Sequence, residues 1–287
     1  MPDKYYDVIV VGRSIGALVA AALLARRDFT VLVVGQGTLP ANYSYEGRTL
    51  RRRAFTMLAA TSPVWLRALR ELAKSQTWRR RVEHASPMLQ VVMAKRRFDV
   101  PPDAALFAGE VEREFPEARR DLADLYADFA RVTAAADAAF ERDAVWPPGR
   151  FMERRETGKV ASTLPYARAE PHADLLAEFS RDHVYRRIVS ESVRFASHTA
   201  LPPPAFAVAR LHGAWTRGLE VLRGGEQELE EMLLGRIASN GGVHLMNERL
   251  GRLDVKRGIV TAATLDGEAR GLGVGFVITD RTGEDIA

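Results

Sequence analysis

The sequence predicts an α/β protein with a mostly helical insert, and three observations support this. Apolar, β-branched runs at residues 7–11 and 30–34 flank an Ala- and Leu-rich stretch at 15–26. The middle of the chain, residues 100–204, is charged and largely helical in periodicity. The last part returns to short β-runs and closes on an apolar run at residues 275–279. The two ends therefore belong to one sheet, and the middle is inserted into it.

The first 36 residues form the best-defined unit. The run at 7–11 is short enough to be a strand buried on both faces. A tight turn of mostly small residues follows, and the stretch at 15–26 has no helix breaker after Gly16. A second apolar strand comes at 30–34. This strand–turn–helix–strand order is typical of a Rossmann-like FAD/NAD(P)-binding domain.

The turn after the first strand is the predicted pyrophosphate site. Compared with the pattern G-x-G-x-x-G, Gly12 holds the first position, Ser14 the second and Ala17 the third. Small residues let backbone N–H groups approach phosphate oxygens, and the positive end of the helix dipole faces the same charge. The candidate cofactor-binding residues here are Gly12, Arg13, Ser14, Ile15, Gly16 and Ala17. The alternative is an ordinary βαβ unit without a ligand.

The end of the second strand is the predicted ribose site. An Asp or Glu ordinarily binds the ribose hydroxyls there. In this chain the place is held by Gly35, followed by Gln36, whose amide would bind a ribose more weakly than a carboxylate. Replacing Gly35 by Glu is therefore expected to tighten FAD or NAD binding.

Composition limits the function classes. The chain has 287 residues and no cysteine, which excludes disulfides, thiolate metal sites and a Cys nucleophile. Its 41 Lys and Arg are interspersed with 37 Asp and Glu, so nucleic acid is not an expected partner. No apolar run reaches the roughly 20 residues that span a bilayer, and no signal peptide is apparent. We expect a cytoplasmic protein that acts on a small molecule.

The domain boundaries are predicted from shifts in pattern. Residues 1–99 form the first part of the dinucleotide-binding domain, 100–204 the helical substrate or cap domain, and 205–287 the return segment. Within them, Ser62 and Pro63 predict a helix start. Further predicted elements are a hairpin or extended segment at 45–56, a helix at 64–73, a hairpin at 87–93 and 95–100, helices at 117–142, 175–179, 185–195 and 226–240, and strands at 243–246, 250–255 and 259–265.

The two ends together resemble one family. The opening VIVVGRSIGALVAAALLA, then Arg223-Gly224-Gly225 before a helix, Gly241-Gly242, a β-meander and a closing VIT strand occur in one order. That order resembles the phytoene desaturase and amine oxidase group of FAD-dependent oxidoreductases. The resemblance implies FAD as cofactor, its pyrophosphate at the first turn, and an adenine contact through the backbone at Leu250. It also implies an apolar or amine substrate bound partly by the insert.

Three departures from the family pattern follow. The ribose-binding acid is replaced by Gly35. The family's Gly-Gly-Arg loop is represented only by Glu46-Gly47-Arg48, which makes Arg48 a further candidate for cofactor binding. The family's second substrate-binding sheet and its C-terminal Gly-Asp segment do not follow the strand at 275–279. The expected alternatives are a truncated sequence, completion by a partner chain or a homo-oligomer, and a degenerate relative with no redox role.

No catalytic residue is predicted, because flavin chemistry belongs to the cofactor and requires no acid–base pair. The six histidines, His84, His172, His183, His198, His212 and His244, have no metal-ligand spacing, so no metal site is expected. Trp146, Trp215 and Phe206 are candidates for lining an apolar channel, and core positions are the alternative.

Three functional hypotheses follow. The first is an FAD-dependent oxidoreductase that transfers a hydride from an apolar or amine substrate to flavin. The second is a degenerate or incomplete nucleotide-binding subunit without redox activity of its own. The third is an NAD(P)-binding reductase, in which basic residues near Gly35 would suit a 2′-phosphate.

Overall fold

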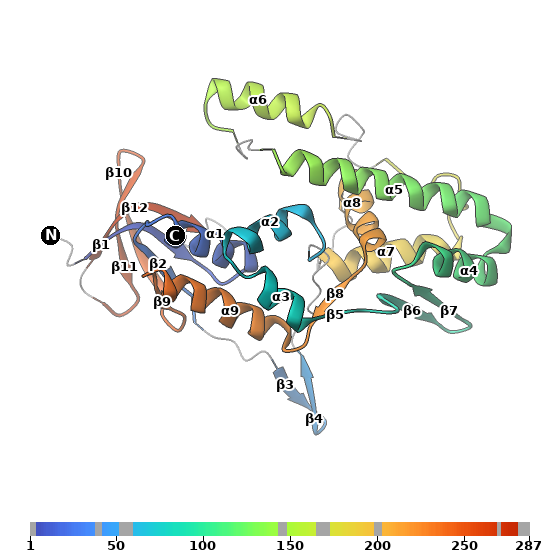
Figure 1. Cartoon of the computed structure of the whole chain (residues 1–287), viewed down its shortest axis with the longest axis horizontal. Coiled ribbons are helices and arrows are strands. Elements are labelled where there is room, and N and C mark those ends of the chain that lie inside the picture. The colour runs from blue at the N-terminus through green and yellow to red at the C-terminus, as the bar shows by residue number, and fades with distance from the viewer. Residues whose placement is uncertain are drawn as a thin grey trace. The chain divides into compact units, whose positions relative to one another are not determined.

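The computed structural model describes residues 4–37, 42–51, 60–142, 148–164, 173–197, 203–268 and 271–280. The chain forms two compact units, which are described separately (Figure 1). The first comprises Met1–Phe55, Ala68–Arg81 and Leu222–Ala287 as far as these ranges are described. The second comprises Thr56–Arg67 and Val82–Val221, with the same restriction.

A six-stranded sheet organises the first unit. Its strand order is β10-β11-β12-β1-β2-β9, and β9, β2, β1 and β12 run parallel (Figure 1). The strands are β1 (Tyr5–Val11), β2 (Val31–Val34), β9 (Val243–Leu245), β10 (Leu250–Lys256), β11 (Ile259–Leu265) and β12 (Gly271–Thr279). The helices of this unit include α1 (Ile15–Arg26), α3 (Ser75–Arg81) and α9 (Gly225–Ser239). The predicted α/β class with a Rossmann-like domain is confirmed.

The central strands are buried because each lies between two others and beneath helices. Val31–Val34 is buried along its whole length, and β1 is buried from Val8 onward. α1 is in contact with α9 and buries alanines such as Ala21 and Ala22, so the two helices approach closely. Uniformly apolar strands of this kind are what a parallel sheet covered on both faces requires.

The prediction that the last apolar strand joins the first in one parallel sheet is confirmed. Val8 pairs with Phe276 and Val11 with Thr279. The start of β1 is further joined to the residue before β2, since the Asp7 carboxylate accepts hydrogen bonds from the Thr30 N–H at 2.7 Å and the Thr30 hydroxyl at 2.6 Å. These bonds lower the pKa of the Asp7 carboxyl below its ordinary value.

One local prediction in this unit needs correction. A separate hairpin consists of β3 (Asn42–Tyr45) and β4 (Arg48–Arg51), with Tyr45 paired to Arg48. The hairpin begins at Asn42, ahead of the hairpin or extended segment predicted at 45–56. The hairpin forms there because Glu46 and Gly47 both adopt positive φ, which suits a two-residue turn.

The second unit is mostly helical. Its elements are α4 (Ala104–Glu114), η1 (Pro116–Ala118), α5 (Arg119–Phe140), α6 (Phe151–Ala161), α7 (Val184–Ser197), α8 (Ala205–Ala214) and η2 (Trp215–Arg217), with the hairpin β6 (Leu89–Met93) and β7 (Arg96–Val100), and the short strands β5 (Val82–His84) and β8 (Glu220–Leu222). α2 (Pro63–Glu71) spans the boundary between the units. Its predicted cap is present, since Ser62 Oγ accepts from the Trp65 N–H at 3.2 Å.

Helix α8 packs closely against α5. Gly213 lies against the Phe129 backbone, so that even a methyl group there would overlap the Phe129 carbonyl. The buried Asp137 of α5 pairs with Arg210 and with Arg217. Residues 175–179, predicted as helical, instead form turns, with a Phe179 N–H to Leu176 carbonyl hydrogen bond of 2.9 Å.

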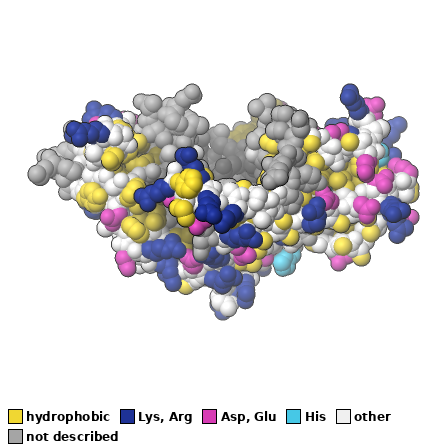
Figure 2. All heavy atoms as spheres, turned by 90° about the horizontal axis from the view of Figure 1, so that it is seen from above, with side chains coloured by type: hydrophobic (Ala, Val, Ile, Leu, Met, Phe, Trp, Pro, Cys, Tyr) yellow, Lys and Arg dark blue, Asp and Glu magenta, His cyan; other side chains and the backbone are white. Residues whose placement is uncertain are grey.

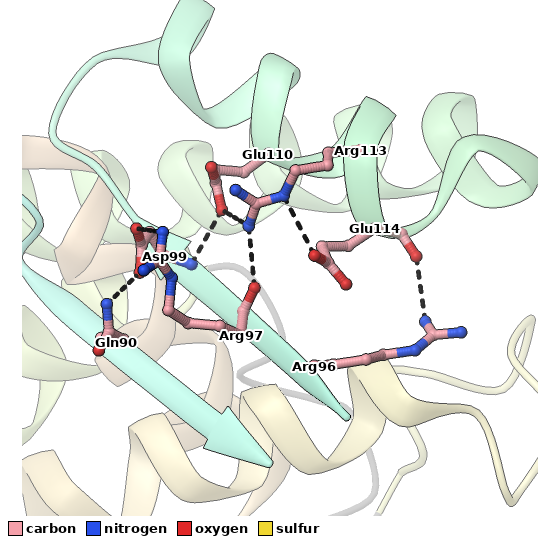
Figure 3. Close-up of polar contacts among 7 residues, drawn as sticks. All are labelled: Gln90, Arg96, Arg97, Asp99, Glu110, Arg113 and Glu114. Atoms are coloured by element: carbon pink, nitrogen blue, oxygen red, sulfur yellow. Dashed lines mark hydrogen bonds and ion pairs between the residues drawn. The ribbon is translucent and has the colours of Figure 1, made fainter. Parts of the chain in front are cut away.

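A polar network fixes the β6–β7 hairpin to α4 (Figure 3). Arg113 donates to the Glu110 carboxylate at 2.7 Å and to the Arg97 carbonyl at 2.9 Å. Glu110 in turn accepts from the Asp99 backbone N–H at 3.1 Å. Beneath this network Phe98 is buried against Phe107, with ring centroids 5.9 Å apart. The hairpin therefore belongs to the helical unit.

The boundaries of the compact units differ from the predicted ones. The hairpin at 89–100 and the helix Ala205–Ala214 both lie in the second unit, whereas the sequence pattern assigned them to the dinucleotide-binding domain. Contacts place them there, since Phe98 and Ala214 share one core cluster with the insert helices. Among the described residues, no helix is both long and apolar enough to cross a membrane.

Candidate dinucleotide site

The turn between β1 and α1 has the backbone geometry of an anion site. Gly12 has φ +122°, a conformation that side chains disfavour, and it is buried. Ser14 caps α1, because its Oγ accepts from the Ala17 N–H at 3.2 Å. Ser14 and Gly16 are exposed, so the start of the helix is open to an approaching ligand. The candidate residues of the turn therefore lie together at the carboxyl end of β1.

An anionic group already lies at this turn. The Asp280 carboxylate accepts the backbone N–H of Ser14 at 2.7 Å, and a methyl group at Gly12 would overlap the same carboxylate. Asp280 follows β12, and its own N–H donates to the Val11 carbonyl at 3.2 Å. Sequence reasoning missed Asp280. Asp280 could have been identified from its position, because it directly follows a strand predicted to lie beside the first one.

Arg13 contacts a carboxylate other than that of Asp280. Its guanidinium donates to both carboxylate oxygens of Glu230 in α9, at 2.6 and 2.9 Å, and to the Gly37 carbonyl at 3.1 Å. Arg13 therefore links the turn to α9 and to the end of β2. The positive charge of Arg13 is paired with the Glu230 carboxylate.

The end of β2 has no room for a side chain at position 35. A Cβ on Gly35 would lie 2.5 Å from the Met246 carbonyl oxygen and 2.6 Å from its Cα. The Gly35 N–H donates to the Leu245 carbonyl at 3.0 Å, so β9 and the chain after it hold this approach. The expectation that Gly35→Glu would tighten cofactor binding is therefore wrong, because close backbone packing requires glycine here.

Gln36 and Leu250 are brought together. Gln36 has φ +65°, and its side-chain oxygen accepts the Leu250 N–H at 3.3 Å. The backbone group predicted to meet adenine is thus bonded to the side chain predicted to meet the ribose. The Arg249 guanidinium lies beside Gly37, with Nε 3.2 Å from the position that a Cβ would take there.

Arg48 is not brought to the turn. It begins β4 in the separate β3–β4 hairpin, and among the described residues no hydrogen bond or ion pair joins it to residues 12–17. Trp215 is fully buried in the core of the helical unit, and Phe206 packs partly buried against the cluster around Phe129. Trp146, His172 and His198 lie outside the described residues.

The part of the chain that the structure describes has no candidate metal site. No three His, Asp or Glu side chains gather there in a way that suits a metal ion. Charged side chains of both signs are interspersed on the face shown in Figure 2. The turn at residues 12–17 is thus the best-built candidate site.

Comparison with known protein families gives a match near the start of the chain. Residues 10–72 match the family of NAD(P)-binding Rossmann-like domains, a range that includes the turn, α1 and β2. This part of the chain is therefore similar to Rossmann-like NAD(P)-binding domains. The comparison with curated proteins gave no match.

Solved structures share the fold at low identity. An oxidoreductase from Methanosarcina mazei is 15% identical, with a TM-score of 0.51 over 95% of this chain and 58% of its own. A putrescine oxidase variant with redesigned cofactor binding is 14% identical, with a TM-score of 0.56 over 99% and 60%. Rab GDI from Plasmodium falciparum is 10% identical, with a TM-score of 0.53 over 96% and 65%.

These likenesses show the fold. The chain spans less than two thirds of the length of each of these three proteins. The predicted resemblance to oxidoreductases of the amine oxidase type is thereby confirmed for the fold, which is one that oxidoreductases use.

Proposed function

We propose that this chain is the dinucleotide-binding part of an FAD-dependent oxidoreductase that takes a hydride from an apolar or amine substrate. The observation that supports this most is the turn at Gly12–Ser14, where the Ser14 N–H and the space beside Gly12 already hold a carboxylate, that of Asp280. β1 lies between β2 and β12, where the strand order reverses, and ligands of such sheets bind at that point.

The turn suits a pyrophosphate, because the Asp280 carboxylate that lies there is also an anion bound by a backbone N–H. Gly12 lets the backbone approach the phosphate oxygens, Ser14 supplies its N–H, and α1 supplies the positive end of its dipole. Bound FAD would supply the hydride acceptor. The ribose would meet Gln36 in place of a carboxylate, so we expect weaker binding than in proteins with that acid.

The test is spectroscopic. Purified protein is titrated with FAD, and flavin absorbance and fluorescence report binding. The flavin-loaded protein is then mixed anaerobically with primary amines and with an apolar polyene. Loss of the oxidised flavin spectrum supports the proposal. Flavin binding without reduction by any substrate class would instead favour the incomplete subunit, and gain of reduction with a partner chain would establish it.

A second candidate is an NAD(P)-binding reductase. The residues at the predicted ribose end of the site favour it. No carboxylate fits at Gly35, whereas the Arg249 guanidinium lies beside Gly37, with Nε 3.2 Å from the position that a Cβ would take there. Cations at this place suit a ribose 2′-phosphate. Arg249→Ala should then weaken binding of 2′-phospho-ADP and leave ADP unchanged. Arg252→Ala is the control, since Arg252 is an exposed arginine in β10, which begins directly after Arg249.

The domain organisation and setting are also part of the proposal. We propose that the helical segment at 100–204 is the substrate or cap domain, and that the protein works in the cytoplasm on a small molecule. We also propose that the protein forms a homo-oligomer or binds a partner chain. Size-exclusion chromatography with light scattering tests this, since a monodisperse monomer that turns over substrate alone would contradict it.

A further inference from the structure

The carboxylate of Asp280 lies at the place that a dinucleotide needs. β12 is parallel to β1 with Thr279 opposite Val11, so the residue after β12 reaches the turn that follows β1. Asp280 then places its Oδ2 2.7 Å from the Ser14 nitrogen. The same carboxylate covers Gly12, the residue whose missing side chain should open the backbone to phosphate. A pyrophosphate and this carboxylate would therefore compete for one N–H group and one space.

The negative charge of Asp280 disfavours binding of an anionic ligand at the same turn. Two anions at one helix N-terminus repel each other, while each alone is stabilised by the dipole and the free N–H groups. Arg13, the nearest candidate to neutralise a second anion in the turn, is bound to both carboxylate oxygens of Glu230. Asp280 is exposed, so its side chain has room to rotate toward solvent.

We propose that Asp280 is an intramolecular competitor that sets the affinity of the turn for dinucleotides. The proposal rests on the proposed function only in that a dinucleotide binds at this turn. Binding requires the Asp280 side chain to leave Ser14 and Gly12. The smaller the fraction of molecules in which it has left, the higher the apparent dissociation constant of the dinucleotide. Occupancy of the cofactor site is thereby coupled to the end of β12.

The test compares Asp280→Asn and Asp280→Ala with the parent chain. The Asn variant keeps the size of the side chain and loses its charge, and the Ala variant loses both. Asp266→Asn is the matched control, since Asp266 is exposed in the turn between β11 and β12. ADP, FAD and inorganic pyrophosphate are titrated by calorimetry, and unfolding of the ligand-free proteins is followed in urea.

Affinity for ADP and FAD should rise in the order parent, Asn, Ala, by about tenfold in total, which corresponds to about 1.4 kcal/mol. Ligand-free stability should fall in the same order, while Asp266→Asn changes neither. Equal or weaker ADP binding by Asp280→Ala overturns the inference, as does failure of all the proteins to bind ADP. Tighter ADP binding without any flavin reduction supports the inference and counts against the oxidoreductase.

Discussion

His212 of α8 and Ser192 of α7 share a hydrogen bond of 2.8 Å in the interior of the helical unit. Both side chains are buried, and the Ser192 hydroxyl also donates to the Val189 carbonyl at 2.8 Å. Because its one proton is used there, Ser192 accepts from Nδ1–H of a neutral imidazole. The Tyr185 hydroxyl lies 3.5 Å from Nε2 on the other side of the ring. This network joins α7 to α8 in the interior, where burial disfavours the charged form of the histidine.

Stability of the helical unit should therefore fall in mild acid. Burial lowers the pKa of His212 to about 4, against about 6.5 in the unfolded chain. Between these values the unfolded state binds more protons, so the free energy of unfolding decreases as the pH falls from about 6.5 to about 4, by roughly 3 kcal/mol in total. Urea unfolding at pH 7, 5.5 and 4.5 measures this.

A variant without the imidazole separates this effect from the acid sensitivity that the carboxylates cause. In His212→Gln the additional slope between pH 6.5 and 4 should disappear, although the variant is less stable at pH 7. His84→Gln is the control, because His84 is exposed at the end of β5. A parent slope that His212→Gln leaves unchanged would contradict the assignment.

Gly12→Ala should abolish dinucleotide binding and destabilise the first unit. A methyl group would overlap Asp280 and would be held at φ +122°, a strain of roughly 1–3 kcal/mol. Gly235→Ala is the matched control, since Gly235 lies in α9 with open space around its Cα. It should raise stability by about 0.5–1 kcal/mol. Calorimetric titration with ADP and thermal unfolding provide both readouts, and ADP binding by Gly12→Ala would place the site elsewhere.

Gly35→Glu should lower the free energy of unfolding and weaken cofactor binding. The new Cβ would lie 2.5 Å from the Met246 carbonyl oxygen, and separating β2 from the chain after β9 costs about 1–3 kcal/mol. Gln36→Glu introduces the same charge one residue later without adding a Cβ, so it should remain folded. The two variants are compared by urea unfolding and FAD titration. Tighter FAD binding by a stable Gly35→Glu protein would restore the original expectation from the sequence.

Arg113→Ala should loosen the β6–β7 hairpin from α4 (Figure 3). Arg113 donates to Glu110, to Glu114 at 3.1 Å and to a β7 carbonyl, and its side chain is partly exposed, so we expect a loss of about 1–2 kcal/mol. Arg131→Ala, which removes an exposed ion pair with Asp128 on α5, should cost under about 0.5 kcal/mol. Equal losses in urea unfolding would show that the network adds no stability.

The sequence by itself determined the local elements of this protein. The helix at 15–26 has the predicted bounds, and the strands before and after it, the 87–100 hairpin and the closing strand beside the first are present. Periodicity and turn residues suffice for these, because each depends on neighbours within one turn of helix or one pleat.

Only the tertiary structure decided what meets at the turn. Asp280 reaches Ser14, and Arg13 reaches Glu230, across more than 200 residues of chain. Gly35 is required by the backbone of Met246, and His212 finds Ser192 on another helix. These contacts depend on which strands and helices become neighbours and in which register. A periodic pattern records which face of an element is buried but does not record the side chain that covers it.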